Sequence, residues 1–219
     1  TKRPYIFHNP ASEISIHTAR NVKKQRGEIT VTDPADVQEL FTYLMNFNGG
    51  CMVKFFALAY FAGIRPGGEL KKLGEDPGSY INTRTGFVTI PKHYSKTDER
   101  RKITISPNLR KWLSEYKDFD IIPPNFDRLY KQVRKEFGMS ENERDETRHS
   151  FISYHVGLHR SIGEAALQAG NSERIVKQHY FDEQEMSEAE HFFSIIPDME
   201  AKRAVRQPAT KPKQLKALT

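Results

Sequence analysis

The segment from Cys51 to Ala62 restricts the possible folds of this chain more than any other part of the sequence. It reads CMVKFFALAYFA, and its only charged residue is Lys54. A helix that is apolar on every side is stable only when other elements cover it all round. The run is too short to cross a bilayer, which needs roughly 18 apolar residues or more. We therefore predict that it forms the central, buried helix of a domain that does not enter a membrane.

Apolar residues at helical spacing predict further helices on both sides of this segment. Thr32-Asp33-Pro34 has the pattern of a helix start, in which a capping side chain precedes a proline in the first turn. Gly49-Gly50 is expected to end that helix. A further helix is predicted to begin at Pro107. The later predicted helices occupy residues 126–137, 143–158, 162–169, 172–180 and 187–195.

Residues 73–106 have a different pattern, in which glycines and prolines mark turns. Two short runs rich in β-branched residues, 87–90 and 102–105, are predicted to be strands, and Tyr80-Ile81 is a candidate for a third. The predicted fold class is mainly α (α+β): a helical bundle with a small antiparallel β-sheet of about three strands inserted early in the domain.

The basic residues are concentrated at the two ends of the chain. The net charge is +6, but residues 1–28 hold six basic and two acidic residues, and residues 201–219 hold six basic residues and no acidic one. Basic arms suit a polyanion such as DNA, although a solubilising tail would have the same composition. We predict a linker or basic arm at 1–28, a compact domain at 29–197, and a basic tail at 198–219 that is disordered or docks elsewhere.

The single cysteine, Cys51, excludes an internal disulfide and a zinc site built from cysteines. The first residues of the sequence lack the apolar segment of a secretory signal. A reducing, cytoplasmic setting is therefore expected.

Four polar motifs lie on or beside the predicted elements. Arg65 follows the buried helix in the run AGIRPGGEL, and Lys96 lies between the two predicted strands in the run SKT. Arg148 lies on a predicted helix in the run DETRHSF. Asn171 lies in the run QAGNS, and Tyr180 follows it nine positions later.

In this order the motifs resemble those of the tyrosine recombinase family, which includes the phage-type integrases. The family pattern has an arginine in G-(L/I)-R-x-x-E, a lysine on a β-hairpin, a second arginine in H-x-x-R-H, a histidine or tryptophan in L-G-H-S, and a tyrosine. The spacing of 23 positions from Arg148 to Asn171 matches the family. The resemblance covers about residues 30–196 and implies the catalytic domain, without the N-terminal DNA-clamping domain of the family.

The resemblance implies that Tyr180 attacks a DNA phosphate and forms a 3′-phosphotyrosine. Arg65 and Arg148 would then hold the non-bridging oxygens of the phosphorane, because guanidinium groups are planar, permanently charged and able to bind two oxygens. Exchange of one phosphodiester for another conserves the bond energy, so we expect no ATP, no metal and no other cofactor.

Lys96 is the implied general acid, which donates a proton to the leaving 5′-oxygen from a mobile hairpin. Its neighbours Lys92, Arg101 and Lys102 leave the choice of residue open. A solvated hairpin lysine without a catalytic role would have the same sequence context.

Asp145 occupies the position of the first histidine of the family motif. Its carboxylate could act as the base for Tyr180 or could orient Arg148, three residues further along the same helix, and we favour the orienting role. His149 and His179 are secondary candidates for proton transfer, although His149 also matches a family position that is usually structural.

Two further positions depart from the family pattern. Asn171 replaces the histidine or tryptophan and keeps a neutral amide donor, but the run Gly-Asn-Ser is also typical of a helix end. Glu69 follows Arg65 by four positions instead of three, which leaves its role open.

The predicted function is that of a site-specific recombinase or integrase domain that acts on double-stranded DNA as a dimer to tetramer. The apolar run at residues 191–196, after Tyr180, is expected to pack on its own or on a neighbouring protomer. A prokaryotic or phage-derived protein bound to the nucleoid would fit. Two alternatives stay open: a type IB topoisomerase-like enzyme, and a degenerate relative that binds DNA without cutting it, which Asp145 and Asn171 would favour.

Overall fold

The computed structural model describes residues 31–96, 98–137, 139, 145–180 and 185–198, apart from the side chains of His179 and Tyr180. The predicted arm at 1–28 and nearly all of the predicted tail at 198–219 lie outside the described residues, so the domain boundaries stay predictions. Within the described part of the chain, no helix has the length and apolar character needed to span a bilayer.

The apolar segment forms the central helix α3 (Val53–Phe61), as predicted. Every residue of α3 except Lys54 is buried. The ammonium group of Lys54 donates to the carbonyl oxygens of Lys117 and Phe119, so its charge lies at the edge of the core. The helices that pack against α3 include α2 (Pro34–Asn46), α6 (Pro107–Glu115) and α8 (Glu146–His159).

The ends of α2 follow from local chemistry. The side chain of Asp33 accepts a hydrogen bond of 2.7 Å from the backbone N–H of Ala35, and Pro34 occupies the first turn. The 3-10 turn η1 (Phe47–Gly50) ends the helix with Gly50 at a φ of +94°, where the Tyr116 ring leaves no room for a side chain.

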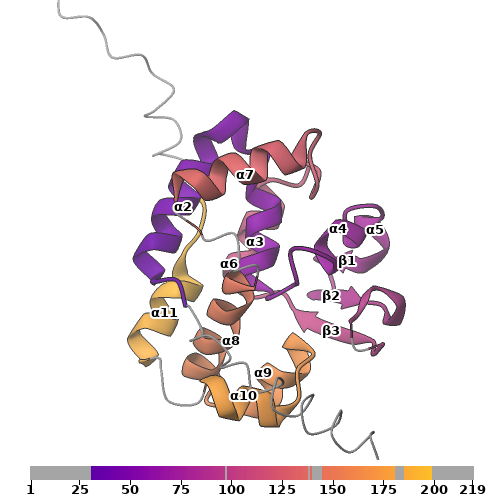
Figure 1. Ribbon diagram of the computed structural model, residues 1–219, viewed down its shortest axis with the longest axis vertical. Coiled ribbons are helices and arrows are strands. Elements are labelled where there is room, and N and C mark those ends of the chain that lie inside the picture. The colour runs from indigo at the N-terminus through magenta and orange to yellow at the C-terminus, as the bar shows by residue number, and fades with distance from the viewer. Residues whose placement is uncertain (1–30, 97, 138, 140–144, 181–184, 199–219) are drawn as a thin grey trace, which may run out of the picture.

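The remaining helices lie close to the predicted ranges (Figure 1). They are α7 (Phe126–Glu136), α9 (Ile162–Ala169), α10 (Glu173–Tyr180) and α11 (Met186–Ser194). Three short helical turns were not predicted, because they are too short to show a helical period. They are α4 (Glu69–Leu73), α5 (Pro77–Tyr80) and the 3-10 turn η2 (Lys92–Tyr94).

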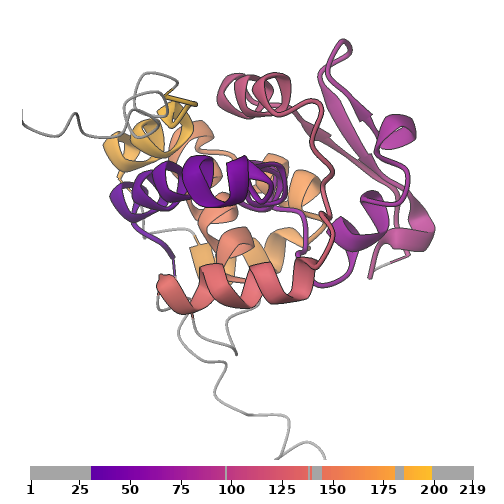
Figure 2. The same ribbon diagram turned by 90° about the horizontal axis from the view of Figure 1, so that it is seen from above.

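The sheet is antiparallel, with strand order β1-β2-β3, and lies at one side of the helical body (Figures 1 and 2). Its strands are β1 (Ile81–Asn82), β2 (Phe87–Ile90) and β3 (Arg101–Thr104). β3 begins one residue earlier than predicted, with Arg101 opposite Ile90. Arg101 and Ile103 face inward, whereas Lys102 and Thr104 face solvent. Because α9 packs against β3, the inward face brings Arg101 to the end of that helix.

The segment after Tyr180 packs on its own chain. Helix α11 lies against α2, α6 and α8, and Phe192 is fully buried against Tyr154 with a ring separation of 4.5 Å. The indole N–H of Trp112 donates to the carbonyl oxygen of Ile195 at 2.9 Å. The described residues of this segment therefore pack within the chain, and the contact with a neighbouring protomer stays a prediction.

Candidate active site

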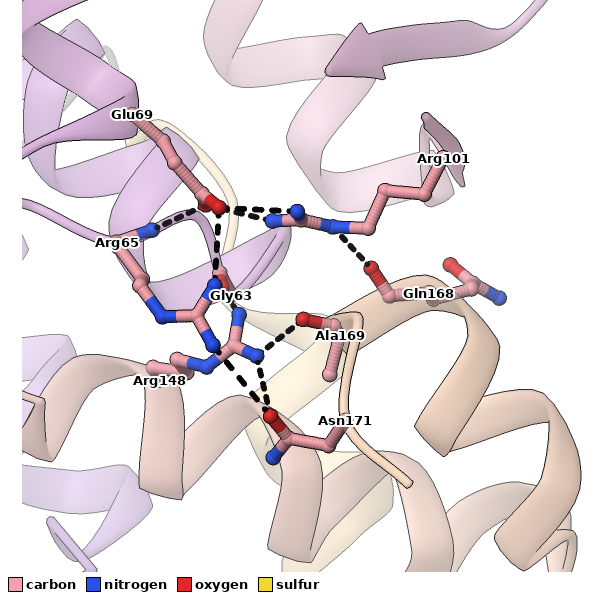
Figure 3. Close-up of polar contacts among 8 residues, drawn as sticks. All are labelled: Gly63, Arg65, Glu69, Arg101, Arg148, Gln168, Ala169 and Asn171. Atoms are coloured by element: carbon pink, nitrogen blue, oxygen red, sulfur yellow. Dashed lines mark hydrogen bonds and ion pairs between the residues drawn. The ribbon is translucent and has the colours of Figure 1, made fainter. Parts of the chain in front are cut away.

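Three of the predicted site residues meet at one atom. Arg65 lies in the loop after α3, Arg148 lies in the first turn of α8, and Asn171 lies between α9 and α10. Both arginines donate to the Oδ1 atom of Asn171, Arg148 at 2.9 Å and Arg65 at 3.5 Å (Figure 3). Because Oδ1 faces the two arginines, the Nδ2 group of the same amide points away from them.

Glu69 holds Arg65 in place. One carboxylate oxygen accepts from Nη1 of Arg65 at 2.9 Å, and the other accepts from the Arg65 backbone N–H at 3.2 Å. Glu69 is the first residue of α4 and is only 1% exposed. The spacing of four positions therefore lets the carboxylate fold back onto the loop that carries Arg65, which answers the question that the sequence left open.

Arg101 also belongs to the cluster, although the sequence indicated it only as a substitute for Lys96. Two guanidinium nitrogens of Arg101 bind the two carboxylate oxygens of Glu69, at 2.9 and 2.6 Å, and Nε donates to the carbonyl oxygen of Gln168 at 3.0 Å. The alternation of inward-facing and outward-facing residues along β3 places Arg101 on the buried side of the sheet. A charged residue on the inward face of a strand requires a buried partner of opposite charge.

The end of α9 shapes this side of the site. The backbone N–H of Gly170 donates to the carbonyl of Leu167 at 3.3 Å, and that of Asn171 donates to the carbonyl of Ala166 at 3.0 Å. With Gly170 at a φ of +65°, these bonds form a Schellman motif. The motif places the side chain of Asn171 beside Arg148.

The Schellman motif leaves the carbonyl oxygens of Gln168 and Ala169 without helical partners. Arg101 donates to the first and Arg148 to the second. Arg148 also donates to the carbonyl of Gly63 at 2.7 Å. The negative end of the α9 dipole thus faces two guanidinium groups, which is the favourable direction for a cation at a helix C-terminus.

Two glycines allow the backbone to approach this cluster. Gly63 has a φ of +58°, and a Cβ built on it would lie 2.4 Å from the ring of Phe151. A Cβ on Gly170 would lie 2.9 Å from Cδ of Arg101. Both positions therefore require a residue with no side chain.

The cluster carries an excess of positive charge. It contains three guanidinium groups and one carboxylate: Arg65 and Arg101 bind Glu69, whereas Arg148 binds Asn171. Burial by itself raises the pKa of Glu69, but the hydrogen bonds and charge of Arg101, together with Arg65, outweigh burial and hold that pKa below its ordinary value. Burial, followed by the charges of Arg65 and Arg101, lowers the pKa of Arg148 to about 9, which leaves it a cation at neutral pH. Such a site favours an anion.

Lys96 is not part of this cluster. It is exposed in the loop between β2 and β3, and no hydrogen bond or ion pair joins it to the arginines within the described residues. Its neighbour Lys92 pairs with Asp98 at 3.1 Å. The predicted role of Lys96 as general acid therefore requires movement of this loop.

Asp145 lies directly before α8 and is exposed. The bonds of Arg148 go to Gly63, Ala169 and Asn171, and no bond joins it to Asp145 in the part of the chain that the structure describes. The charge of Asp145 still acts on Arg148 and raises its pKa, against the effect of burial. His149 is half-buried on the same helix.

Tyr180 is the last residue of α10, and His179 precedes it. Helix α10 begins shortly after Asn171 and packs against α8 and α9. Its eight residues span about 12 Å. Since neither side chain is among the described ones, the position of the Tyr180 hydroxyl stays a prediction.

A groove of about 980 Å³ adjoins the Arg65 loop, between that loop and α7. Pro66 and Gly67 form its border with the loop, and Phe126 and Tyr130 supply aromatic walls. Its charged lining comprises four basic residues and one acidic residue: Lys71, Lys131, Arg134, Lys135 and Asp127. The groove is therefore positively charged on balance and adjoins the loop that carries Arg65.

The solved structures include a similar fold, that of XerA recombinase. The two chains have a TM-score of 0.52 and are 13% identical, and the match covers 80% of this chain and 66% of that one, just under two thirds of its length. No protein-family model matches the chain, and no curated protein matches it in sequence. This likeness confirms the predicted fold class, which is mainly helical with a small antiparallel sheet and has the fold of XerA recombinase.

Proposed function

We propose that this chain is the catalytic domain of a tyrosine recombinase, which cuts and rejoins double-stranded DNA through a 3′-phosphotyrosine at Tyr180. The observation that carries the proposal is the convergence of Arg65 and Arg148, from different elements, on the Oδ1 atom of Asn171. The fold shared with XerA recombinase supports it. The basic groove beside Arg65 supports DNA as the polyanion.

In the proposed reaction the phenolic oxygen of Tyr180 attacks the phosphorus of the scissile phosphate. The pentacovalent phosphorane gains negative charge on its non-bridging oxygens, which Arg65 and Arg148 would hold. Asn171 would add its Nδ2 group only after its amide turns, because Oδ1 faces the two arginines here. The bond from phosphorus to the 5′-oxygen then breaks. Attack by a 5′-hydroxyl reverses these steps and releases Tyr180, so no external energy source is consumed.

Two protons move in the cleavage step. The Tyr180 hydroxyl loses its proton to a base, for which Asp145, His149 and His179 are the candidates. The 5′-oxygen gains a proton from Lys96, once the β2–β3 loop closes over the DNA. The exposed position of Lys96 in that loop is compatible with such a movement.

Recombination also requires that two cleaved duplexes be held together, so we propose self-assembly of several protomers on DNA. Because Phe192 of α11 is buried in its own chain, the assembly contact would use other surfaces of the segment after Tyr180. Exposed apolar side chains near it include Ile175 and Met186.

The test is covalent trapping on nicked duplex DNA with a randomised central sequence. Cleavage beside the nick releases a short fragment, so religation fails and the protein remains linked to DNA. The wild-type chain is expected to give an adduct that survives denaturation, and Tyr180→Phe is expected to give none. Tyr43→Phe, on α2, is the matched control and should behave as wild type.

The same assay separates the alternatives. Complete lack of adduct with the wild-type chain on every DNA tested would favour a degenerate relative that only binds DNA. An adduct accompanied by relaxation of supercoiled plasmid, without recombinant products, would favour the topoisomerase-like enzyme. Arg148→Lys keeps the charge but loses the planar pair of donors, and is expected to slow cleavage by roughly 100-fold or more.

A further inference from the structure

We propose that Arg101 is a positioning residue, which holds Glu69 and through it sets Arg65 for phosphate binding. The inference rests on the proposed function and deepens it. Arg101 is not itself a phosphate ligand in this proposal, because all three of its guanidinium nitrogens, Nε, Nη1 and Nη2, already donate to partners within the chain. Its guanidinium group already binds both oxygens of Glu69 and the carbonyl of Gln168.

The physical reason lies in the competition for Glu69. A buried carboxylate is stable only with full charge compensation, and Arg101 supplies most of it through two parallel bonds. Arg65 therefore needs only Nη1 to bind Glu69, and its Nη2 atom faces Asn171 instead. Without Arg101, Glu69 would draw the whole Arg65 guanidinium toward itself and away from the phosphate.

Arg101 also connects the hairpin to the site. It is the first residue of β3 and ends the loop that carries Lys96. Its bond to the Gln168 carbonyl and the close approach of Gly170 fix this end of the loop to α9. This end of the loop is therefore anchored to the arginine cluster.

The test compares Arg101→Gln with Arg100→Gln, which removes the same charge from the exposed neighbouring residue. Single-turnover cleavage of the nicked substrate and the Kd for DNA are measured for each variant. Arg101→Gln is expected to lower the cleavage rate about 100-fold, as misplacement of a catalytic group does, and to change the Kd less than about threefold. Arg100→Gln is expected to leave the cleavage rate unchanged.

A double-mutant cycle shows whether Arg101 acts through Arg65. In an Arg65→Ala background, Arg101→Gln is expected to have little further effect on the cleavage rate, because the group that it positions is already absent. Multiplicative losses in the double variant would overturn the proposal, as would an Arg101→Gln enzyme that cleaves at the wild-type rate.

Arg101→Lys covers the case in which Arg101→Gln does not fold. It keeps the charge opposite Glu69 but loses the two-bond geometry. It is expected to fold and to cleave at a rate between those of Arg101→Gln and wild type, and a wild-type rate would refute the positioning role. If the wild-type chain forms no adduct at all, the proposed function fails, which is a different result from an active enzyme that is indifferent to Arg101.

Discussion

At the scale of single residues, the arginine cluster depends on glycine as much as on charge. Gly63 lets the Arg65 loop approach α8, and its carbonyl oxygen binds Arg148. Any side chain at this position would meet the Phe151 ring and would have to adopt a φ of +58°. The steric overlap with the ring and the strained backbone conformation would each lower the stability of the folded state.

Gly63→Ala is therefore expected to lower the free energy of unfolding by about 2–4 kcal/mol. Gly67→Ala lies in the same loop, where a Cβ has no atom within 4 Å and φ is not positive, so it is the matched control and should change stability little. Denaturant titration of both variants checks this. Equal stability of the two variants would show that the Phe151 contact is unimportant.

His155 is a second buried residue whose state can be tested. It is 4% exposed and its Nε2 atom lies 3.2 Å from Nε2 of Gln168, which donates to it only if the ring is neutral. Burial, followed by the charge of His159, lowers the pKa of His155 from 6.5 to about 4. Between these pH values the unfolded chain binds a proton that the folded chain does not.

Stability is consequently expected to fall as the pH is lowered from about 6.5 to 4, by at most roughly 3 kcal/mol from this residue. His155→Gln removes the titrating group, so its unfolding free energy should vary less over this range. Thermal or denaturant unfolding at several pH values provides the measurement. A variant with the same pH profile as wild type would rule out this assignment.

At the scale of elements, the side chains of the site come from the ends of helices and strands. Arg148 occupies the first turn of α8, Arg101 the first position of β3, and Asn171 the Schellman motif after α9. Ends of elements leave backbone groups unsatisfied and side chains free to converge. The surface of α7 extends this charged region, since Lys131 and Lys135 lie one turn apart and both line the groove.

Replacement of Lys131 and Lys135 by glutamine is expected to weaken DNA binding and to reduce the slope of log K against log salt by about 1 for each lost phosphate contact. Lys111→Gln, on the exposed side of α6 and outside the groove, is the control for loss of charge. Fluorescence anisotropy at several salt concentrations gives the slopes. An unchanged slope in the double variant would mean that DNA does not occupy this groove.

At the scale of the whole molecule, the fold holds together a charge cluster that repels itself. Of its three guanidinium groups only those of Arg65 and Arg101 bind the carboxylate of Glu69, and the burial of Arg148 adds a desolvation cost. An anion bound at the cluster would relieve the repulsion, so binding and folding are linked.

Inorganic phosphate is therefore expected to raise the melting temperature by roughly 3 °C at several times its Kd, compared with sodium chloride of equal ionic strength. Arg65→Ala should show a smaller rise, and the difference between the two proteins removes the general effect of phosphate on proteins. Differential scanning calorimetry measures both. Equal rises in wild type and variant would show that phosphate does not bind at the cluster.

The sequence by itself determined the elements and the order of the motifs. The apolar run at 51–62, the cap at Asp33 and the β-branched run at 87–90 act on their immediate neighbours, so the period and the capping residues predict them. The two arginines and Asn171 could be chosen in advance because their chemistry and spacing match a known pattern. These are local properties of the chain, and the structure confirms the elements that they predict.

Tertiary structure alone decided which groups became partners. Arg101 binds Glu69 from 32 positions away and meets Gln168 across 67 positions, and α11 closes on α2 and α8. Side-chain period places a residue on a face but does not say which residue lies opposite. That choice depends on the close packing of distant elements, where a guanidinium group, a carboxylate and a helix end must be satisfied together once water is excluded.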